Sequence, residues 1–215
     1  LKKSSIERHL YRVGIDGSGL ERITKEKGIH KVGFSPDGQY YLDSYSNSST
    51  LPSLTLRKKD GTNLHVLAKP RPELLQGLNL QTPELFTIPT SDGFPMPAQI
   101  LKPKDFDSGK SYPLIFHIYG GPSAPTVFDQ WQGSSLFFDN MLLDRGYLVV
   151  KFDHRSATAI SKKLENRLIM MMSGPIEIVD ILDGIHWLKS QSYVDPDRVG
   201  IWVCSGAGSF TLNSM

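Results

Sequence analysis

Hydrophobic and polar residues alternate in short runs over the first third of the chain, a pattern typical of β-strands that are buried on one face. Strands are predicted at residues 10–13 and 20–24, with an Asp-Gly pair between them at 16–17. Asp-Gly between strand-like runs indicates a tight hairpin, because both central residues of the turn can take a positive φ. The pair recurs at 37–38 and 60–61, which is 21 and then 23 residues further along. Such a hairpin repeat is typical of β-propeller blades, and a small independent β-meander is the alternative.

Proline punctuates the next stretch, residues 70–97, which therefore resembles a linker that enters a second domain. We accordingly place the end of a β-propeller domain at 1–69 and the start of a catalytic domain at 70–215. Residues 84–88 and 96–101 are predicted to form the first hairpin of that second domain.

From residue 112 onwards the pattern predicts an α/β fold. The run at 113–119 is continuously apolar, as a strand buried on both faces requires, and 147–152 and 199–203 are predicted to be the next two strands. Helices are predicted between these runs, at 131–145 and 176–190, from apolar residues at helical spacing. In the first of these helices the apolar face is predicted to consist of Leu136, Phe137, Met141 and Leu142. Alternation of strand and helix predicts parallel pairing of the strands with right-handed crossovers.

The passage from the last strand into the next helix carries the candidate chemistry. Its sequence is Val203-Cys204-Ser205-Gly206-Ala207-Gly208. In a nucleophile elbow a serine lies on a sharp turn between a buried strand and a helix, and the next backbone N–H faces the developing oxyanion. The usual form is Gly-x-Ser-x-Gly, whereas valine and alanine stand at the outer positions here. The alternative interpretation is a Gly/Ser-rich strand–helix turn, which is common in any parallel sheet.

Several segments, in order along nearly the whole chain, resemble the prolyl oligopeptidase family of serine peptidases, and within it the dipeptidyl-peptidase-IV-like branch. They are Phe-Ser-Pro-Asp-Gly at 34–38, Tyr-Gly-Gly-Pro at 119–122, Asp-His-Arg at 153–155 and Tyr-Val-Asp-Pro-Asp-Arg-Val-Gly-Ile-Trp at 193–202. The resemblance implies a seven- or eight-bladed propeller beside an α/β-hydrolase domain. The expected fold class is therefore α/β, an incomplete α/β-hydrolase fold preceded by β-hairpins of a β-propeller.

The resemblance also implies roles for three residues. Ser205 matches the catalytic nucleophile, the Tyr119 hydroxyl matches an oxyanion donor, and the Gly206 N–H would be the second donor. In this fold the triad Asp and His follow the serine along the chain. Residues 206–215 contain neither Asp nor His, so we expect both beyond residue 215 and expect the 215-residue chain alone to be inactive.

The chain departs from the family pattern at two tight turns, and three functions therefore stay open. Glycines that the family has after the position of Arg155 are absent, and Val203 and Ala207 replace the outer glycines of the elbow. The leading hypothesis is a serine peptidase that cleaves short peptides. A catalytically impaired or non-catalytic relative that acts as a binding protein is the second. An esterase or acylaminoacyl-peptide hydrolase is the third.

Charge and composition limit the classes of partner and cofactor that the chain is expected to bind. The 24 basic and 22 acidic side chains give a net charge of +2, too close to neutral to favour nucleic acid. The single cysteine excludes an internal disulfide framework. We find no metal-ligand spacing and no phosphate loop, so no metal and no cofactor are expected. The resemblance implies a peptide substrate and is compatible with a homodimer.

Overall fold

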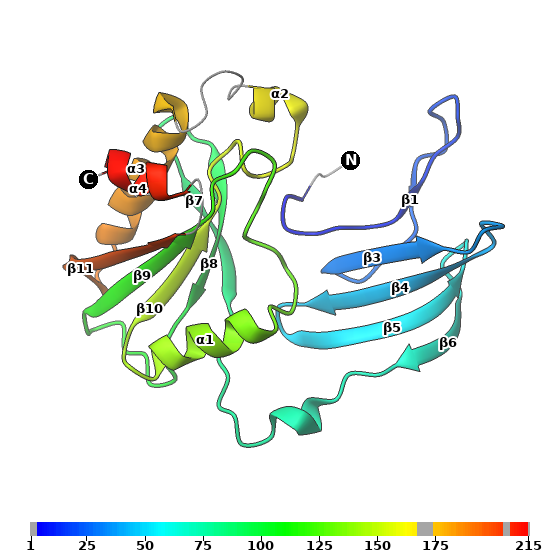
Figure 1. The fold of residues 1–215 in the computed structure, drawn as a ribbon, viewed down its shortest axis with the longest axis horizontal. Coiled ribbons are helices and arrows are strands. Elements are labelled where there is room, and N and C mark those ends of the chain that lie inside the picture. The colour runs from blue at the N-terminus through cyan, green and yellow to red at the C-terminus, as the bar shows by residue number, and fades with distance from the viewer. Residues whose placement is uncertain (1–3, 167–173, 204–206, 215) are drawn as a thin grey trace. The chain divides into compact units, whose positions relative to one another are not determined.

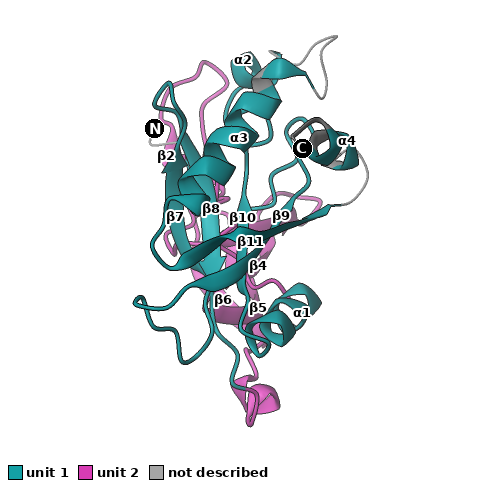
Figure 2. Cartoon of the chain, turned by 90° about the vertical axis from the view of Figure 1, so that its left-hand side faces the viewer, with its two compact units in different colours: residues 1–5, 79–127, 134–215 teal, residues 6–78, 128–133 magenta. Residues whose placement is uncertain are grey.

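The computed structural model describes residues 4–166, 174–203 and 207–214. The chain divides into two compact units (Figure 2). One unit consists of residues 6–78 and 128–133, and the other consists of residues 1–5, 79–127 and 134–215. Among the described residues no helix is long and apolar enough to cross a membrane.

The first of these units is built from antiparallel strands, as predicted (Figure 1). A two-stranded ribbon pairs β1 (Tyr11–Arg12) with β2 (Glu21–Arg22). A four-stranded sheet follows in the order β3-β4-β5-β6, with bounds Ile29–Phe34, Tyr40–Asn47, Thr50–Lys58 and Asn63–Ala68. The three predicted Asp-Gly turns join β1 to β2, β3 to β4 and β5 to β6. A short 3₁₀ helix, η1 (Pro72–Leu75), comes after β6.

Charged residues are buried inside the four-stranded sheet. The side chains of His30 and Asp43 are both fully buried, and His30 Nδ1 lies 3.0 Å from an Asp43 carboxylate oxygen. Arg57 Nε is 3.0 Å from the other oxygen of that carboxylate. The Tyr45 ring stacks on His30 with 4.8 Å between centroids. The buried Asp43 carboxylate thus lies against two basic side chains, which offsets part of the cost of burying it.

The second unit is a five-stranded sheet in the order β11-β9-β10-β8-β7. The strand bounds are Glu84–Pro89 for β7, Pro95–Leu101 for β8, Tyr112–Ile118 for β9, Leu148–Phe152 for β10 and Val194–Val203 for β11. The predicted first hairpin pairs β7 with β8. β9 is parallel to both β10 and β11, which confirms the predicted parallel pairing.

Four helices are described in this unit: α1 (Ser134–Leu143), α2 (Lys162–Glu165), α3 (Pro175–Lys189) and α4 (Ala207–Ser214). Asp139 of α1 contacts Lys151 of β10. Gly184 of α3 lies against the ring of Phe152, the next residue of β10. Successive side chains of a strand point to opposite faces, so α1 and α3 cover opposite faces of the sheet.

The predicted apolar face of the helix at 131–145 is wrong in part. Phe137 and Met141 are 38% and 51% exposed, whereas Asp139 and Asn140 are buried on α1. Asn140 Oδ1 accepts a hydrogen bond from the Gln81 N–H at 2.7 Å. Specific polar partners therefore decide which side of this helix faces the protein, and hydrophobic spacing alone does not reveal them.

The last strand also begins earlier than predicted. β11 starts at Val194, and its pairing with β9 is irregular between Val194 and Val199. The Asp195 carboxylate accepts hydrogen bonds from the Asp197 N–H at 3.0 Å and from Arg198 Nε at 2.6 Å. Residues 195–198 therefore form an irregularity inside a strand that is longer than predicted.

Candidate active site

The parallel strands β9, β10 and β11 end at the same edge of the sheet. Ile118 is the last residue of β9 and pairs with Val203, the last residue of β11. Ligands of open α/β sheets bind outside the carboxyl ends of the strands. Tyr119 directly follows β9 at this edge and is 38% exposed. Chain connectivity thus brings Tyr119 to the edge at which the strand leading to Ser205 also ends.

Of the three site residues inferred from the sequence, Tyr119 is described, whereas Ser205 and Gly206 lie outside the described residues. The elements on either side of them are described: β11 ends at Val203, and α4 begins at Ala207. A strand that passes into a helix within three residues is compatible with a nucleophile elbow.

The turn that carries Tyr119 has an unusual backbone. Gly120 has a φ of +74° and Ser123 a φ of +48°. Glycine takes a left-handed conformation freely, but a residue with a Cβ rarely does. Gly121 adds a second requirement, because a Cβ atom there would approach Cε1 of the Tyr119 ring to 2.6 Å. The Gly-Gly pair therefore permits both the direction of the turn and the position of the tyrosine ring.

A run of buried polar residues follows β10 and contacts this turn. Asp153 is 1% exposed, and its carboxylate accepts hydrogen bonds from the Thr126 and Val127 N–H groups at 2.8 and 2.9 Å. The Thr126 hydroxyl donates to the same carboxylate at 2.7 Å. Burial raises the pKa of Asp153, and the hydrogen bonds that it accepts oppose that rise.

His154 contacts Gly120, the residue that directly follows Tyr119. Its side chain is fully buried, and its Nε2–H donates to the Gly120 carbonyl oxygen at 2.9 Å. Burial lowers the pKa of His154, because an apolar environment disfavours the imidazolium form. Two residues further on, the Ser156 carbonyl oxygen accepts a hydrogen bond from the Ser123 N–H at 3.0 Å.

Arg155 anchors the same run to the rest of the unit. Its guanidinium Nη2 is 2.6 Å from Asp180 Oδ1 on α3, and its Nη1 is 2.7 Å from Asp92 Oδ2 between β7 and β8. The Arg155 N–H also donates to Asp180, at 3.0 Å. These hydrogen bonds hold the pKa of Asp92 well below its usual range and raise that of Arg155. The guanidinium therefore stays charged, and it links three segments that are distant in sequence.

The sequence contained Asp-His-Arg at 153–155 only as part of a family resemblance, and its structural role was missed. One local signal could have pointed to it. Three consecutive ionisable residues directly follow a buried strand at the carboxyl edge of a parallel sheet, where polar groups need partners and functional turns lie close by. The participation of Asp92 could not have been found in this way, because it depends on the β7–β8 hairpin folding back towards α3.

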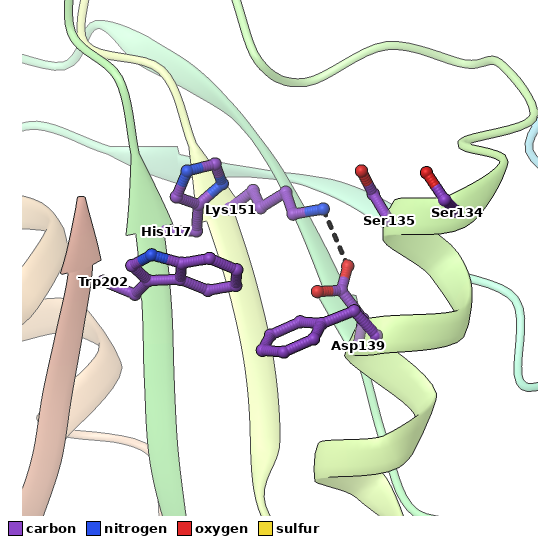
Figure 3. Close-up of a pocket in the computed structure, with 7 residues that line it drawn as sticks. His117, Ser134, Ser135, Asp139, Lys151 and Trp202 are labelled. Carbon is purple, nitrogen blue, oxygen red and sulfur yellow. Dashed lines mark hydrogen bonds and ion pairs between the residues drawn. The ribbon is translucent and has the colours of Figure 1, made fainter. Parts of the chain in front are cut away.

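A pocket of about 340 Å³ lies beside α1, next to the carboxyl ends of β9, β10 and β11. It is lined by His117, Ser134, Ser135, Phe138, Asp139, Lys151 and Trp202. Figure 3 shows the Lys151 side chain reaching towards Asp139, and the two groups are 2.7 Å apart. The charges of Lys151 and Asp139 therefore offset each other. We assign the pocket no catalytic role. Within the described ranges, no group of three or more His, Cys, Asp or Glu residues could hold a metal ion.

Comparison with known proteins agrees with this arrangement. Residues 1–52 match the family model of the dipeptidyl peptidase IV (DPP IV) N-terminal region, and residues 134–215 match that of the prolyl oligopeptidase family. Dipeptidyl peptidase 8 of Homo sapiens and that of Mus musculus are each 30% identical to the chain over 223 residues. This alignment takes in all of the chain but only 25% of each relative.

A solved structure shows the same fold. The crystal structure of Porphyromonas gingivalis dipeptidyl peptidase 4 superposes with a TM-score of 0.90 at 26% sequence identity. The match covers 99% of this chain and 30% of that one. The fold is thus part of a β-propeller followed by the first strands of an α/β-hydrolase domain. The chain belongs to the prolyl oligopeptidase family of serine peptidases, in the dipeptidyl-peptidase-IV-like branch.

Proposed function

We propose that the complete protein is a serine peptidase that hydrolyses short peptides with Ser205 as its nucleophile. The observation that carries the proposal is the exposed Tyr119 on a Gly-Gly turn, at the sheet edge where β11 ends two residues before Ser205. The family relationship supports it, since two relatives that match all of the chain are named dipeptidyl peptidase 8.

In the proposed mechanism the Ser205 hydroxyl attacks the peptide carbonyl carbon. A histidine acts as the general base, takes the hydroxyl proton and later gives it to the leaving amine, while an aspartate orients that histidine. The Tyr119 hydroxyl and the Gly206 N–H donate hydrogen bonds to the oxyanion that forms. Loss of one such donor typically lowers kcat by about 10²–10³-fold.

We also propose that the propeller domain ends within residues 1–69 and that the catalytic domain begins within residues 70–215.

A homodimer is proposed on the family relationship alone. Sedimentation velocity of the complete protein at several concentrations tests the homodimer, and a single monomeric species at every concentration would exclude it.

A fluorophosphonate probe tests the central proposal, because it reacts with activated serines. The complete protein should be labelled, and peptide mapping should place the label on Ser205. A Ser205→Ala variant is the matched control and should not be labelled. Absence of label on a folded wild-type protein would contradict the peptidase assignment.

A substrate panel then separates related activities. Unblocked X-Pro amides test dipeptide release, N-acylated peptides test acylaminoacyl-peptide hydrolysis, and simple esters test an esterase. We expect the amides of short peptides to be the best substrates. An enzyme that cleaves only the esters would exclude the peptidase.

A second candidate function is supported by the elbow itself. A β-branched Val203 and Ala207 stand where the family has glycines, in a turn where strand and helix approach closely. A non-catalytic relative that acts by binding would tolerate such residues. A Val203→Gly, Ala207→Gly double variant distinguishes impairment from a non-catalytic role: activity that appears only in the variant indicates an impaired enzyme, and no activity in either protein favours the binding role.

A further inference from the structure

The turn that carries Tyr119 has an internal backbone hydrogen bond, from the Ala124 N–H to the Gly121 carbonyl oxygen at 3.2 Å, but it also contains two left-handed residues. Gly120 and Ser123 both have left-handed backbones, with φ of +74° and +48°. That conformation is unfavourable for Ser123, which has a Cβ, and it persists only where neighbouring groups impose it. Tyr119 is also 38% exposed, so packing covers only part of its side chain. Contacts from outside the turn therefore contribute to its geometry.

The segment after β10 supplies those contacts at three points. The Asp153 carboxylate accepts from the N–H groups of residues 126 and 127. The Ser156 carbonyl oxygen accepts from the Ser123 N–H. The His154 ring donates to the Gly120 carbonyl oxygen at 2.9 Å. Of the three, the histidine contact is the nearest to Tyr119 in sequence, because it acts on the carbonyl group of the next residue.

We propose that His154 is a positioning residue for Tyr119, and that its Nε2–H group holds the Tyr119 turn where the tyrosine hydroxyl can reach an oxyanion. A carbonyl oxygen can only accept a hydrogen bond, so Nε2 must carry the proton. The proposal rests on the proposed function, because the position of Tyr119 affects the rate only if the protein is a peptidase.

Further hydrogen bonds hold the backbone around His154 in place. Its own carbonyl oxygen accepts a hydrogen bond from the Ala157 N–H at 3.0 Å. The following residue, Arg155, is tied to Asp180 of α3 through its backbone N–H and its guanidinium. Motion of the imidazole relative to α3 is therefore restricted. An oxyanion donor is effective when it is fixed in advance by such supporting contacts.

Two variants of similar length separate the hydrogen bond from the packing of the ring. The amide Nε2 of glutamine lies about as far along the side chain as Nε2 of histidine and can donate to Gly120. Methionine has nearly the shape of glutamine and cannot donate. His154→Gln should therefore retain activity within about threefold of wild type. His154→Met should lower kcat by about tenfold or more, because small misplacements of catalytic groups have effects of that size.

The effect should fall on kcat and leave KM nearly unchanged, because an oxyanion contact forms only in the transition state. A double-mutant cycle with Tyr119→Phe shows whether His154 acts through the tyrosine. In the Tyr119→Phe background, His154→Met should lower kcat by less than about threefold, since coupled residues are not additive. Independent, multiplicative losses would overturn the proposal, as would equal losses in the Gln and Met variants.

Hydrogen exchange gives a readout that needs no catalysis. In His154→Met, amides in a peptide spanning residues 119–126 should exchange faster than in wild type, while those of the β3–β6 sheet stay unchanged. His154→Gln should match wild type. If the wild-type protein is neither labelled nor active, the peptidase assignment fails, and the exchange experiment alone decides whether His154 holds the turn. Unchanged exchange in the Met variant would refute that role.

Discussion

Gly121 lies against the ring of Tyr119 so closely that a Cβ atom on the glycine would come within 2.6 Å of the ring carbon Cε1. Real Cβ atoms do not approach other atoms so closely, so any side chain at position 121 must displace the tyrosine. The glycine therefore determines where the tyrosine ring can lie.

Gly121→Ala should accordingly impair catalysis more than it impairs folding. Displacement of the Tyr119 ring by a fraction of an ångström to 1 Å should lower kcat by about tenfold to a hundredfold. Steady-state kinetics of the complete protein measure this loss. Gly200→Ala is the matched control, because the closest contact of a Cβ there is an ordinary 3.9 Å to Ile115, and it should leave kcat unchanged. A Gly121→Ala enzyme with wild-type kcat would mean that the ring position does not matter.

A second glycine tests the packing of α3 on the sheet. A Cβ at Gly184 would lie 2.7 Å from two carbons of the Phe152 ring. Alanine in place of glycine normally stabilises a helix by up to about 1 kcal/mol. Overpacking of a core costs about 1–3 kcal/mol, and this term should win here because Phe152 is completely buried. We expect Gly184→Ala to lower the free energy of unfolding, as measured by denaturant titration.

Gly208→Ala in α4 provides the comparison for that experiment. Nothing lies within 4 Å of a Cβ at this position, so the variant should be neutral or slightly stabilising. A Gly184→Ala protein as stable as the Gly208→Ala protein would show that α3 can move away from Phe152.

The ion pairs of Arg155 should be unequal in strength. The Asp180 side chain is 1% exposed and that of Asp92 is 60% exposed, while the Arg155 side chain that they share is 8% exposed. Removal of one partner from a buried pair typically costs about 3–5 kcal/mol, because the remaining charge is left uncompensated. Asp180→Asn should approach that loss, whereas Asp92→Asn should have a much smaller effect. Denaturant unfolding of the two variants side by side tests this, and equal losses would contradict the prediction.

The fold followed from the sequence where local chemistry decides it. Asp-Gly pairs at the three hairpin turns and mainly apolar runs in the parallel strands specify structure within a few residues, so both were predicted. The exposed faces of Phe137 and Met141 were not, because the orientation of α1 depends on the contacts of Asp139 with Lys151 and of Asn140 with Gln81. Such long-range polar contacts leave no periodic signal in the sequence.

The residues of the candidate site also differ in whether the sequence alone indicates their role. Tyr119 was identified through the family resemblance of Tyr-Gly-Gly-Pro at 119–122, a short segment that can be read locally from the sequence. The contact between His154 and Gly120 joins residues 34 positions apart, and its formation requires β9 and β10 to pair in parallel. No pattern around residue 154 indicates which carbonyl the imidazole will reach, so this role became visible only in the structure.

The buried imidazole of His154 should make stability depend on pH in the mildly acidic range. Burial lowers its pKa from the ordinary value of 6.5, so the unfolded chain binds a proton at a pH where the folded protein does not. Stability is therefore fully present above about pH 6.5 and falls as the pH decreases from there through the lower pKa of the folded state. His154→Gln removes this group and should flatten the profile between these limits. Urea unfolding of the wild type and of His154→Gln, from pH 7.5 down to 5, measures this difference in the pH dependence of stability.

His117 needs a parallel His117→Gln control, because burial, and after it the charge of Lys151, lowers the pKa of His117 as well. The imidazole of His117 is less buried than that of His154 and should contribute less of the slope. An unchanged profile in His154→Gln would mean that the buried ring accepts a proton as readily as it does in the unfolded chain.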